Sequence, residues 1–157
     1  MNVHAILLWG FAATIVLMAV TITAQSFGIT RIDIPFILGT MVTADRDRAK
    51  IVGLLMHLVN GWIFAFVYGL FFQTLTPTWS IGALMGFIQG VFVSAVALPL
   101  LPGVHPRMVS DFRGPEPTRL LEPPGFLTTN HGRKTPVLLL VAHTLYGAII
   151  GAMYVAR

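Results

Sequence analysis

Three long uncharged segments limit what this chain can fold into more than any other feature. Residues 1–30, 51–106 and 135–156 contain no Asp, Glu, Lys or Arg. A helix needs about 20 mostly apolar residues to cross the hydrocarbon core of a bilayer, so the middle segment is long enough for two crossings. Hydrophobic residues make up 55% of the chain and charged residues only 10%, which is far from the composition of a soluble domain. The sequence therefore predicts an all-α, polytopic membrane protein.

The expected architecture is a single four-helix transmembrane domain that comprises residues 1–157. Pro77 cannot continue a helix and Trp79 suits the membrane interface, so these residues separate the second span from the third. The chain begins without the basic region of a cleaved signal peptide, and we expect the first span to be retained. The spans are expected at residues 5–26, 50–73, 80–101 and 136–155, and the long loops at residues 27–49 and 102–135.

The two long loops predict the orientation of the chain. Together with Lys50, which adjoins the first loop, they carry nine of the ten Lys and Arg residues, and Arg157 is the tenth. Because basic residues concentrate on the cytoplasmic side, we expect both loops to be cytoplasmic and both termini to lie outside. The bases alternate with acidic residues and form no patch studded with aromatic side chains, so no nucleic-acid partner is expected. The anionic headgroups of the lipid bilayer are the expected contact.

Each loop also contains a local signal. In the first loop, the apolar stretch "IPFILGTMV" is too short to cross the membrane and suits the interface. Asp45 follows it and is the expected N-cap of the second span. The second loop is rich in proline, so it cannot form a regular helix. An extended segment of this kind, "DFRGPEPTRLLEPPGFLTTNHGRK", typically lies along the surface of a partner.

The spans contain an internal sequence similarity. "GFAATIVLMAVT" from Gly10 aligns with "GFIQGVFVSAVA" from Gly86, and "HLVNGWIFAFVY" from His57 aligns with "HTLYGAIIGAMY" from His143. The two helical hairpins would cross the membrane in the same direction. This pattern predicts a parallel repeat with a pseudo-two-fold axis along the membrane normal. The repeat would place His57 and His143 at one depth.

Small residues recur every four positions along three of the spans. Such small-xxx-small stripes let helix backbones approach closely in membranes. His57 and His143 lie on two of these stripes, so we expect both imidazoles to point into the bundle. Gln89 adds a polar side chain at mid-membrane, and we expect it to form an interhelical hydrogen bond. The expected helix-packing residues are Gly53, Gly61, Gly69, Gly82, Gly86, Gly90, Ser94, Gly147 and Gly151.

Several interpretations of the two histidines are open. Each imidazole could be neutral and fix the helix register by hydrogen bonding to Asn60, Tyr146, Thr144 or a backbone carbonyl. Alternatively, His57 and His143 could be the axial ligands of haem b, and Gly61 and Gly147 would leave room for the macrocycle. The small residue Gly53, four positions before His57, is also typical of pigment-ligating helices. A quinone or lipid is a further candidate ligand.

Enzymatic chemistry has little support in the sequence. All six acidic residues lie in the two loops, so the spans offer no carboxylate for a proton relay or a cation site. No nucleophile elbow, phosphate loop or metalloprotease motif is present, and we assign no catalytic residue. His105 and His131 share the second loop with acidic residues, but their spacing fits no standard metal site, so we assign no metal. The chain has no cysteine for a redox pair.

The favoured function is a non-catalytic accessory or assembly subunit of a larger membrane complex. Its partners would be other integral membrane subunits, which it would contact through the glycine stripes and the loop of residues 102–135. One alternative is a di-histidine haem b protein that transfers electrons. A second alternative is a small-solute transporter, which the repeat favours but which lacks a polar pathway.

Five motifs carry a resemblance to a known family. They are "GFAAT", "IPFILGT", the His-x3-Gly of "HLVNGWIFAFVYGLFF", the apolar-Pro end of the third span and "AHTLYGAIIGAMY". Together they resemble an uncharacterised family of small four-helix bacterial membrane proteins. The resemblance implies the four-helix fold and a bacterial inner-membrane location. It implies no activity, ligand or catalytic residue.

Overall fold

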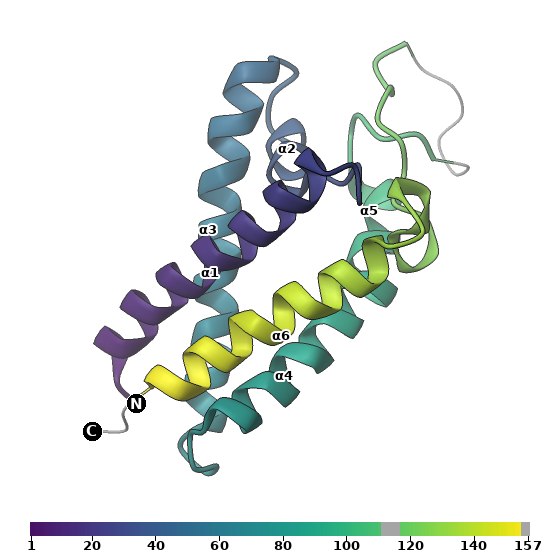
Figure 1. The fold of residues 1–157 in the computed structure, drawn as a ribbon. Helices are drawn as coiled ribbons and strands as arrows, with labels where there is room; N and C mark the ends of the chain where they lie inside the picture. The colour runs from purple at the N-terminus through teal and green to yellow at the C-terminus, as the bar shows by residue number, and fades with distance from the viewer. Residues whose placement is uncertain (111–116, 155–157) are drawn as a thin grey trace.

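The computed structural model describes residues 1–110 and 117–154 of the chain. It is all-helical and contains four helical segments that are long and apolar enough to span a membrane (Figure 1). The predicted fold class is therefore confirmed. The four segments are α1 (Val3–Ser26), α3 (Arg46–Phe71), the stretch Trp79–Val104 and α6 (Thr135–Met153).

The third segment is longer and less regular than predicted. It consists of α4 (Trp79–Phe92), a π-helical turn η1 (Val93–Ala97) and α5 (Leu98–Val104). Pro99 lies at the start of α5 and has no backbone N–H to give to the preceding turn. The wider π-helical turn accommodates this missing bond, so the helix continues through a proline that the sequence placed near its end.

Side-chain caps define where the helices begin. The Asp45 carboxylate accepts a hydrogen bond of 2.8 Å from the backbone N–H of Arg48, as the sequence predicted. Asp33 caps the short helix α2 (Ile34–Thr40) in the same way, through the N–H of Phe36 at 3.0 Å. The apolar stretch of the first loop is therefore a helix of its own, which the sequence did not specify.

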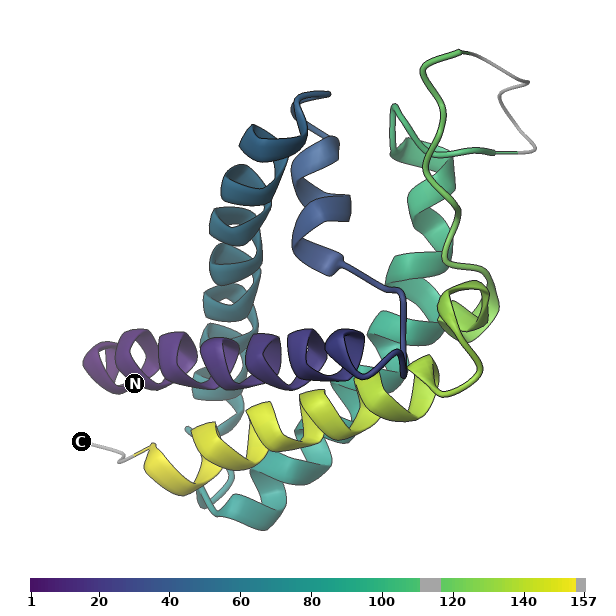
Figure 2. The same ribbon diagram turned by 45° about the horizontal axis from the view of Figure 1, so that its top comes forward.

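Helix α3 packs against two different partners along its length. Its C-terminal half runs antiparallel to α1, with Gly61 against Thr14 and Gly69 against Ile6. Its N-terminal half packs against α2, where Gly53 lies against the backbone of Pro35. Figure 2 shows α2 beside this half of α3, while α1 crosses the other half. The entry of α2 separates α1 from the N-terminal half of α3.

Helix α4 packs antiparallel against α6 through backbone contacts. Gly82 lies against Gly147 and Gly151, and Gly86 lies against the carbonyl of His143. The eight glycines expected at helix contacts are all buried against segments of this same chain. Ser94 is buried as well, and its hydroxyl donates to the carbonyl of Gly90 at 2.7 Å.

Helix α1 also packs along α6 and so joins the two hairpins (Figures 1 and 2). Among the described residues, α3 and α4 form no comparable packed pair. The hairpins also differ in register, because Gly86 lies against His143 whereas its counterpart Gly10 lies against Ala65 rather than His57. The contacts thus differ between the two hairpins, and the internal repeat stays a prediction from the sequence.

The described part of the proline-rich loop packs onto the chain itself. The backbone N–H of Arg31 donates to the carbonyl of His131 at 2.8 Å, and the Arg31 guanidinium lies 3.3 Å from the Glu122 carboxylate. The hydroxyls of Thr30 and Thr135 are 2.7 Å apart and buried. A 3₁₀ segment η2 (Phe126–His131) precedes α6. These contacts attach the loop to the end of α1 and the start of α6.

Candidate ligand site between the two hairpins

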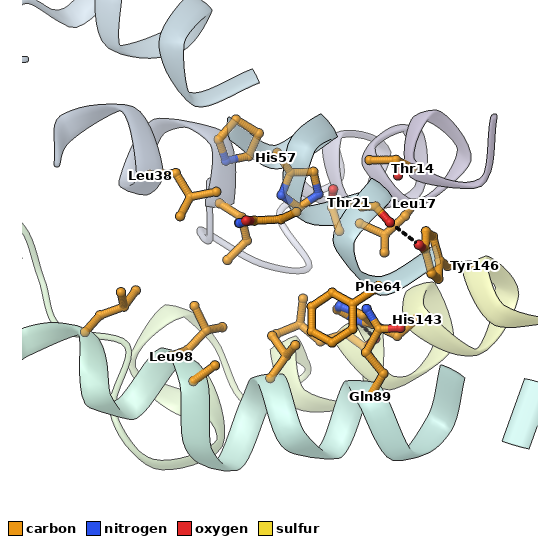
Figure 3. Close-up of a pocket in the computed structure, with 18 residues that line it drawn as sticks. Thr14, Leu17, Thr21, Leu38, His57, Phe64, Gln89, Leu98, His143 and Tyr146 are labelled. Carbon is orange, nitrogen blue, oxygen red and sulfur yellow. Dashed lines mark hydrogen bonds between the residues drawn. The ribbon is translucent and has the colours of Figure 1, made fainter. Parts of the chain in front are cut away.

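A cavity of about 250 Å³ lies where the two hairpins and α2 meet (Figure 3). Helices α1, α2 and α3 supply one side of its wall, and α4, η1, α5 and α6 supply the other. Helix α2 packs against the N-terminal half of α3 and α1 against the C-terminal half, and the partly open cavity lies beside this division. His57 and His143 both line it, from α3 and α6 respectively.

His143 is buried and has a defined tautomer. Its Nδ1 lies 2.7 Å from the carbonyl oxygen of Leu139, one turn earlier in α6. A carbonyl oxygen can only accept, so Nδ1 carries the proton and donates it. Nε2 is then the unprotonated nitrogen in the neutral ring. Gly86 and Gly90 of α4 pack directly against His143, which fixes its position.

His57 lines the same cavity but is less constrained. Its imidazole forms no hydrogen bond with any residue that the structure describes. The sequence offered Asn60, Tyr146 and Thr144 as partners, yet Tyr146 donates to the carbonyl of Gly61 at 2.5 Å and Thr144 to that of Leu140 at 2.7 Å. Asn60 lines the cavity, is exposed, and has no hydrogen bond among the described residues. The cavity therefore contains polar groups that the protein leaves unused.

A tyrosine pair connects the hairpins beside the cavity. Tyr68 on α3 donates a hydrogen bond of 2.8 Å to the side-chain oxygen of Gln89 on α4, and both residues are buried. The ring of Tyr68 meets that of Tyr146 edge to face, with centroids 5.8 Å apart. The interhelical hydrogen bond expected of Gln89 is present. The role of Tyr68 was not predicted, although Tyr68 directly precedes Gly69 and Tyr146 directly precedes Gly147 on the glycine stripes.

Two threonines of α1 were also missed. Thr14 and Thr21 line the cavity, and each donates its hydroxyl to a backbone carbonyl, that of Gly10 at 2.7 Å and that of Met18 at 2.9 Å. Residues seven positions apart share one face of a helix, so the spacing of these threonines could have marked this face. No charged residue is among the described residues that line the cavity.

The two glycines expected to make room for a haem pack against other parts of the chain. Gly61 lines the cavity, but Thr14 packs against it and its carbonyl accepts the Tyr146 hydroxyl. Gly147 lies in the contact between α6 and α4, against Gly82 and Gly86. A cavity of about 150 Å³ holds benzene. The cavity seen here therefore suits one substituted ring and is small for a tetrapyrrole.

The third histidine of interest, His105, secures the cavity wall from outside the spans. Its ring is fully buried, with Nε2 2.9 Å from the carbonyl oxygen of Ile37 and Nδ1 accepting from the N–H of Arg107 at 3.1 Å. Arg107 also donates to the carbonyl of Thr40 at 2.5 Å. Burial lowers the pKa of His105, the bond to Ile37 opposes this shift and the Arg107 charge adds to it. The hydrogen bonds from His105 to Ile37 and from Arg107 to Thr40 hold the C-terminal end of α2.

His131 lies apart from this arrangement, beside the contact between Arg31 and Glu122. It is buried, and its Nε2 has no hydrogen-bond partner among the described residues. Burial lowers the pKa of His131, Glu122 opposes this effect and Arg31 adds to it. Within residues 1–110 and 117–154, no group of three or more His, Cys, Asp or Glu residues is placed to hold a metal ion.

Comparison with known proteins gives no guide to this site. No family model, no curated protein and no solved structure matches the chain. The resemblance to an uncharacterised membrane-protein family therefore stays a prediction, and the function is argued from geometry.

Proposed function

We propose that this protein is a non-catalytic membrane protein that binds one small, uncharged molecule between its two hairpins. The observation that carries the proposal is that His57 and His143, from helices of different hairpins, line one cavity of about 250 Å³. Ligand sites are typically apolar clefts with a few converging polar groups, and this cavity has that composition.

The charge of the ligand follows from the lining. The described lining offers no carboxylate, lysine or arginine to pair with an ionised group. An unpaired charge in a region of low dielectric constant is costly, so the site favours a neutral molecule. The volume, above that of a cavity that holds benzene, favours a single ring or a molecule of similar size.

The accessory-subunit role predicted from the sequence has less support. It relied on glycine stripes and on the proline-rich loop as surfaces for partner subunits. The glycines of these stripes pack within the chain, and the described part of the loop contacts α2, α6 and the residues that follow α1. The observed contacts therefore support intramembrane ligand binding more than they support a partner interface.

We also propose that the protein lies in a bacterial inner membrane with both termini outside. Two observations support one common side for the long loops. Figure 1 places α2 and the described part of the second loop at the same end of the molecule, away from the N-terminus. Arg46, Arg48 and Lys50 are exposed at that end, at the start of α3. Arg157, expected on the opposite side, lies outside the described residues.

Photolabelling in lipid nanodiscs tests the binding role. Two small neutral aryl diazirines would be used, one wholly apolar and one bearing a hydroxyl, because the proposal requires only that either enters the cavity. We expect labelled residues on the cavity walls of α1, α3 and α6. Ala97→Phe should abolish this labelling because Ala97 lines the cavity, whereas Val96→Phe, at an exposed neighbouring position, should not.

The controls are thermal unfolding and labelling of the lipid-facing surface. Both variants should unfold near the wild-type temperature and keep their surface labels. If Ala97→Phe does not fold, Leu101→Phe supplies a second cavity-filling variant. Labels confined to exposed positions for both probes would refute the binding role.

A further inference from the structure

We infer that the ligand of the cavity donates a hydroxyl proton, and that it belongs to the chemical class of phenols and quinols. This inference rests on the proposed binding role and specifies which chemistry the site selects. It follows from how the side chains of the cavity use their own protons.

Three hydroxyl groups of the wall have already committed their protons. Thr14 donates to Gly10, Thr21 donates to Met18, and Tyr146 donates to Gly61. A hydroxyl has one proton and two lone pairs, so each of these groups offers only acceptor capacity to a ligand. All three line the cavity.

The fourth acceptor is His143. Its Nδ1–H is used by the carbonyl of Leu139, which leaves Nε2 as a lone pair in the neutral ring. No described residue donates to this nitrogen. These four residues of α1 and α6 therefore offer acceptors and no free proton.

Donor capacity comes from residues of α3 and α4. The side-chain oxygen of Gln89 accepts from Tyr68, so its NH₂ group remains to donate. His57 on α3 has both ring nitrogens without a hydrogen-bond partner among the described residues. A ligand hydroxyl can pair with both sets of groups, since its proton goes to an acceptor of α1 or α6 and its oxygen accepts from Gln89 or His57.

This pattern discriminates between closely related ring compounds. A phenol or quinol is neutral, carries a donor and fits as a single ring. An ether or a quinone only accepts and would leave the acceptors of α1 and α6 unpaired. The loss of one such hydrogen bond to a buried group corresponds to about a tenfold weaker affinity.

Competition against the hydroxylated photoprobe tests the inference on the full chain in nanodiscs. Phenol and its methyl ether, anisole, have the same ring but differ in the hydroxyl proton. We expect phenol to compete about tenfold better than anisole. A parallel pair, a quinol and its dimethyl ether with the same isoprenoid tail, distinguishes a membrane-borne ligand from a water-soluble one. Stronger competition by the tailed quinol indicates a ligand that arrives from the bilayer.

Matched threonine variants locate the effect in the cavity. Thr21→Val and Thr14→Val each remove an acceptor with little change in shape and should reduce the preference for phenol. Thr144→Val is the control, because Thr144 also donates to a carbonyl one turn earlier but does not line the cavity. An unchanged preference in both cavity variants would overturn the assignment of these acceptors.

The outcomes separate this inference from the proposed function. Equal competition by phenol and anisole would leave a binding cavity but overturn its selectivity for hydroxyl donors. Competition by neither, together with no cavity labelling by either probe, would overturn both. Water molecules that satisfy the acceptors would then be the occupants.

Discussion

Tyr68 and Gln89 form a buried hydrogen bond of 2.8 Å that joins two helices, α3 and α4, which otherwise do not pack as a pair. The bond closes one end of the space between the hairpins, next to the cavity. Both residues are buried within the membrane-spanning helices. The bond should therefore contribute to the arrangement of the hairpins as well as to stability.

We predict that Tyr68→Phe lowers the free energy of unfolding by about 1 kcal/mol, since it leaves the oxygen of Gln89 without a donor. Gln89→Leu removes the acceptor and should cost a similar amount. In a double-mutant cycle, measured by reversible unfolding in micelles, the two effects should not add. Additive effects would contradict an energetic link between these side chains. Tyr68→Phe keeps the edge-to-face ring contact with Tyr146 and so isolates the hydroxyl.

The contact between α4 and α6 should tolerate no side chain at Gly86. A Cβ atom there would overlap the backbone carbonyl of His143, which cannot move without shifting α6. We predict that Gly86→Ala destabilises the protein by about 1–3 kcal/mol, the range for overpacked cores. Gly103→Ala is the matched control, because a Cβ at Gly103 meets open space. Equal melting temperatures for the two variants would show that the helices can separate at no cost.

Local sequence signals were enough to predict the helices and several of their contacts. Uncharged length predicted the four spans, the side chain of Asp45 predicted a helix start, and the glycine stripes marked positions where backbones meet. Each of these features depends on residues close together in the chain. The same is true of the polar side chain of Gln89, which had to find a partner within the membrane.

The cavity could not be predicted, because it depends on how distant elements divide the surface of α3. Gly53 was expected to pack against another span, yet it accepts the short helix α2 at Pro35. Because α2 packs at this position, α1 packs against the other half of α3, and His57 lies beside the cavity. The spacing of small residues along a helix does not specify which segment packs there, since a small residue accommodates any close backbone. The same ambiguity applies to Gly147, which was expected both at a helix contact and beside a cofactor and which lies against α4.

The volume of the cavity leads to a prediction about haem. A tetrapyrrole between His57 and His143 would need far more space than about 250 Å³, and Thr14 and Tyr146 occupy the positions beside Gly61. We expect the protein, purified in mild detergent and reduced with dithionite, to show no Soret band. A stoichiometric band that His57→Ala or His143→Ala abolishes would contradict the cavity described here and restore the electron-transfer alternative.

The C-terminal end of α2 should loosen as the pH falls. In its neutral form, His105 donates from Nε2 to the carbonyl of Ile37 and accepts at Nδ1 from the N–H of Arg107. Protonation of Nδ1 removes that acceptor and places a charge in a buried position near Arg107. The pKa of His105 therefore lies below its ordinary value of 6.5 in the folded protein, with burial as the main cause.

The sign of the effect follows from this shift. Below pH 6.5, His105 binds a proton in the unfolded chain but not in the folded protein. The contribution of neutral His105 to the free energy of unfolding is therefore fully present above this pH, and it decreases as the pH falls towards the folded pKa. The slope for one group is at most about 1.4 kcal/mol per pH unit. Because burial also lowers the pKa of His131, both histidines act in the same direction.

Two variants separate these contributions. His105→Gln retains a donor for the carbonyl of Ile37 but does not titrate, so it should reduce the loss of stability between pH 7 and pH 5. His131→Gln removes only the contribution of His131, so the loss due to His105 should remain.

Hydrogen exchange of the α2 amides gives a local measurement, because His105 and Arg107 hold the last carbonyls of that helix. We expect the protection of these amides, measured against the intrinsic exchange rate at each pH, to be lower at pH 5 than at pH 7 in the wild type. In His105→Gln the protection should not change. Equal protection at pH 5 and pH 7 in the wild type would show that protonation of His105 does not loosen this end of α2.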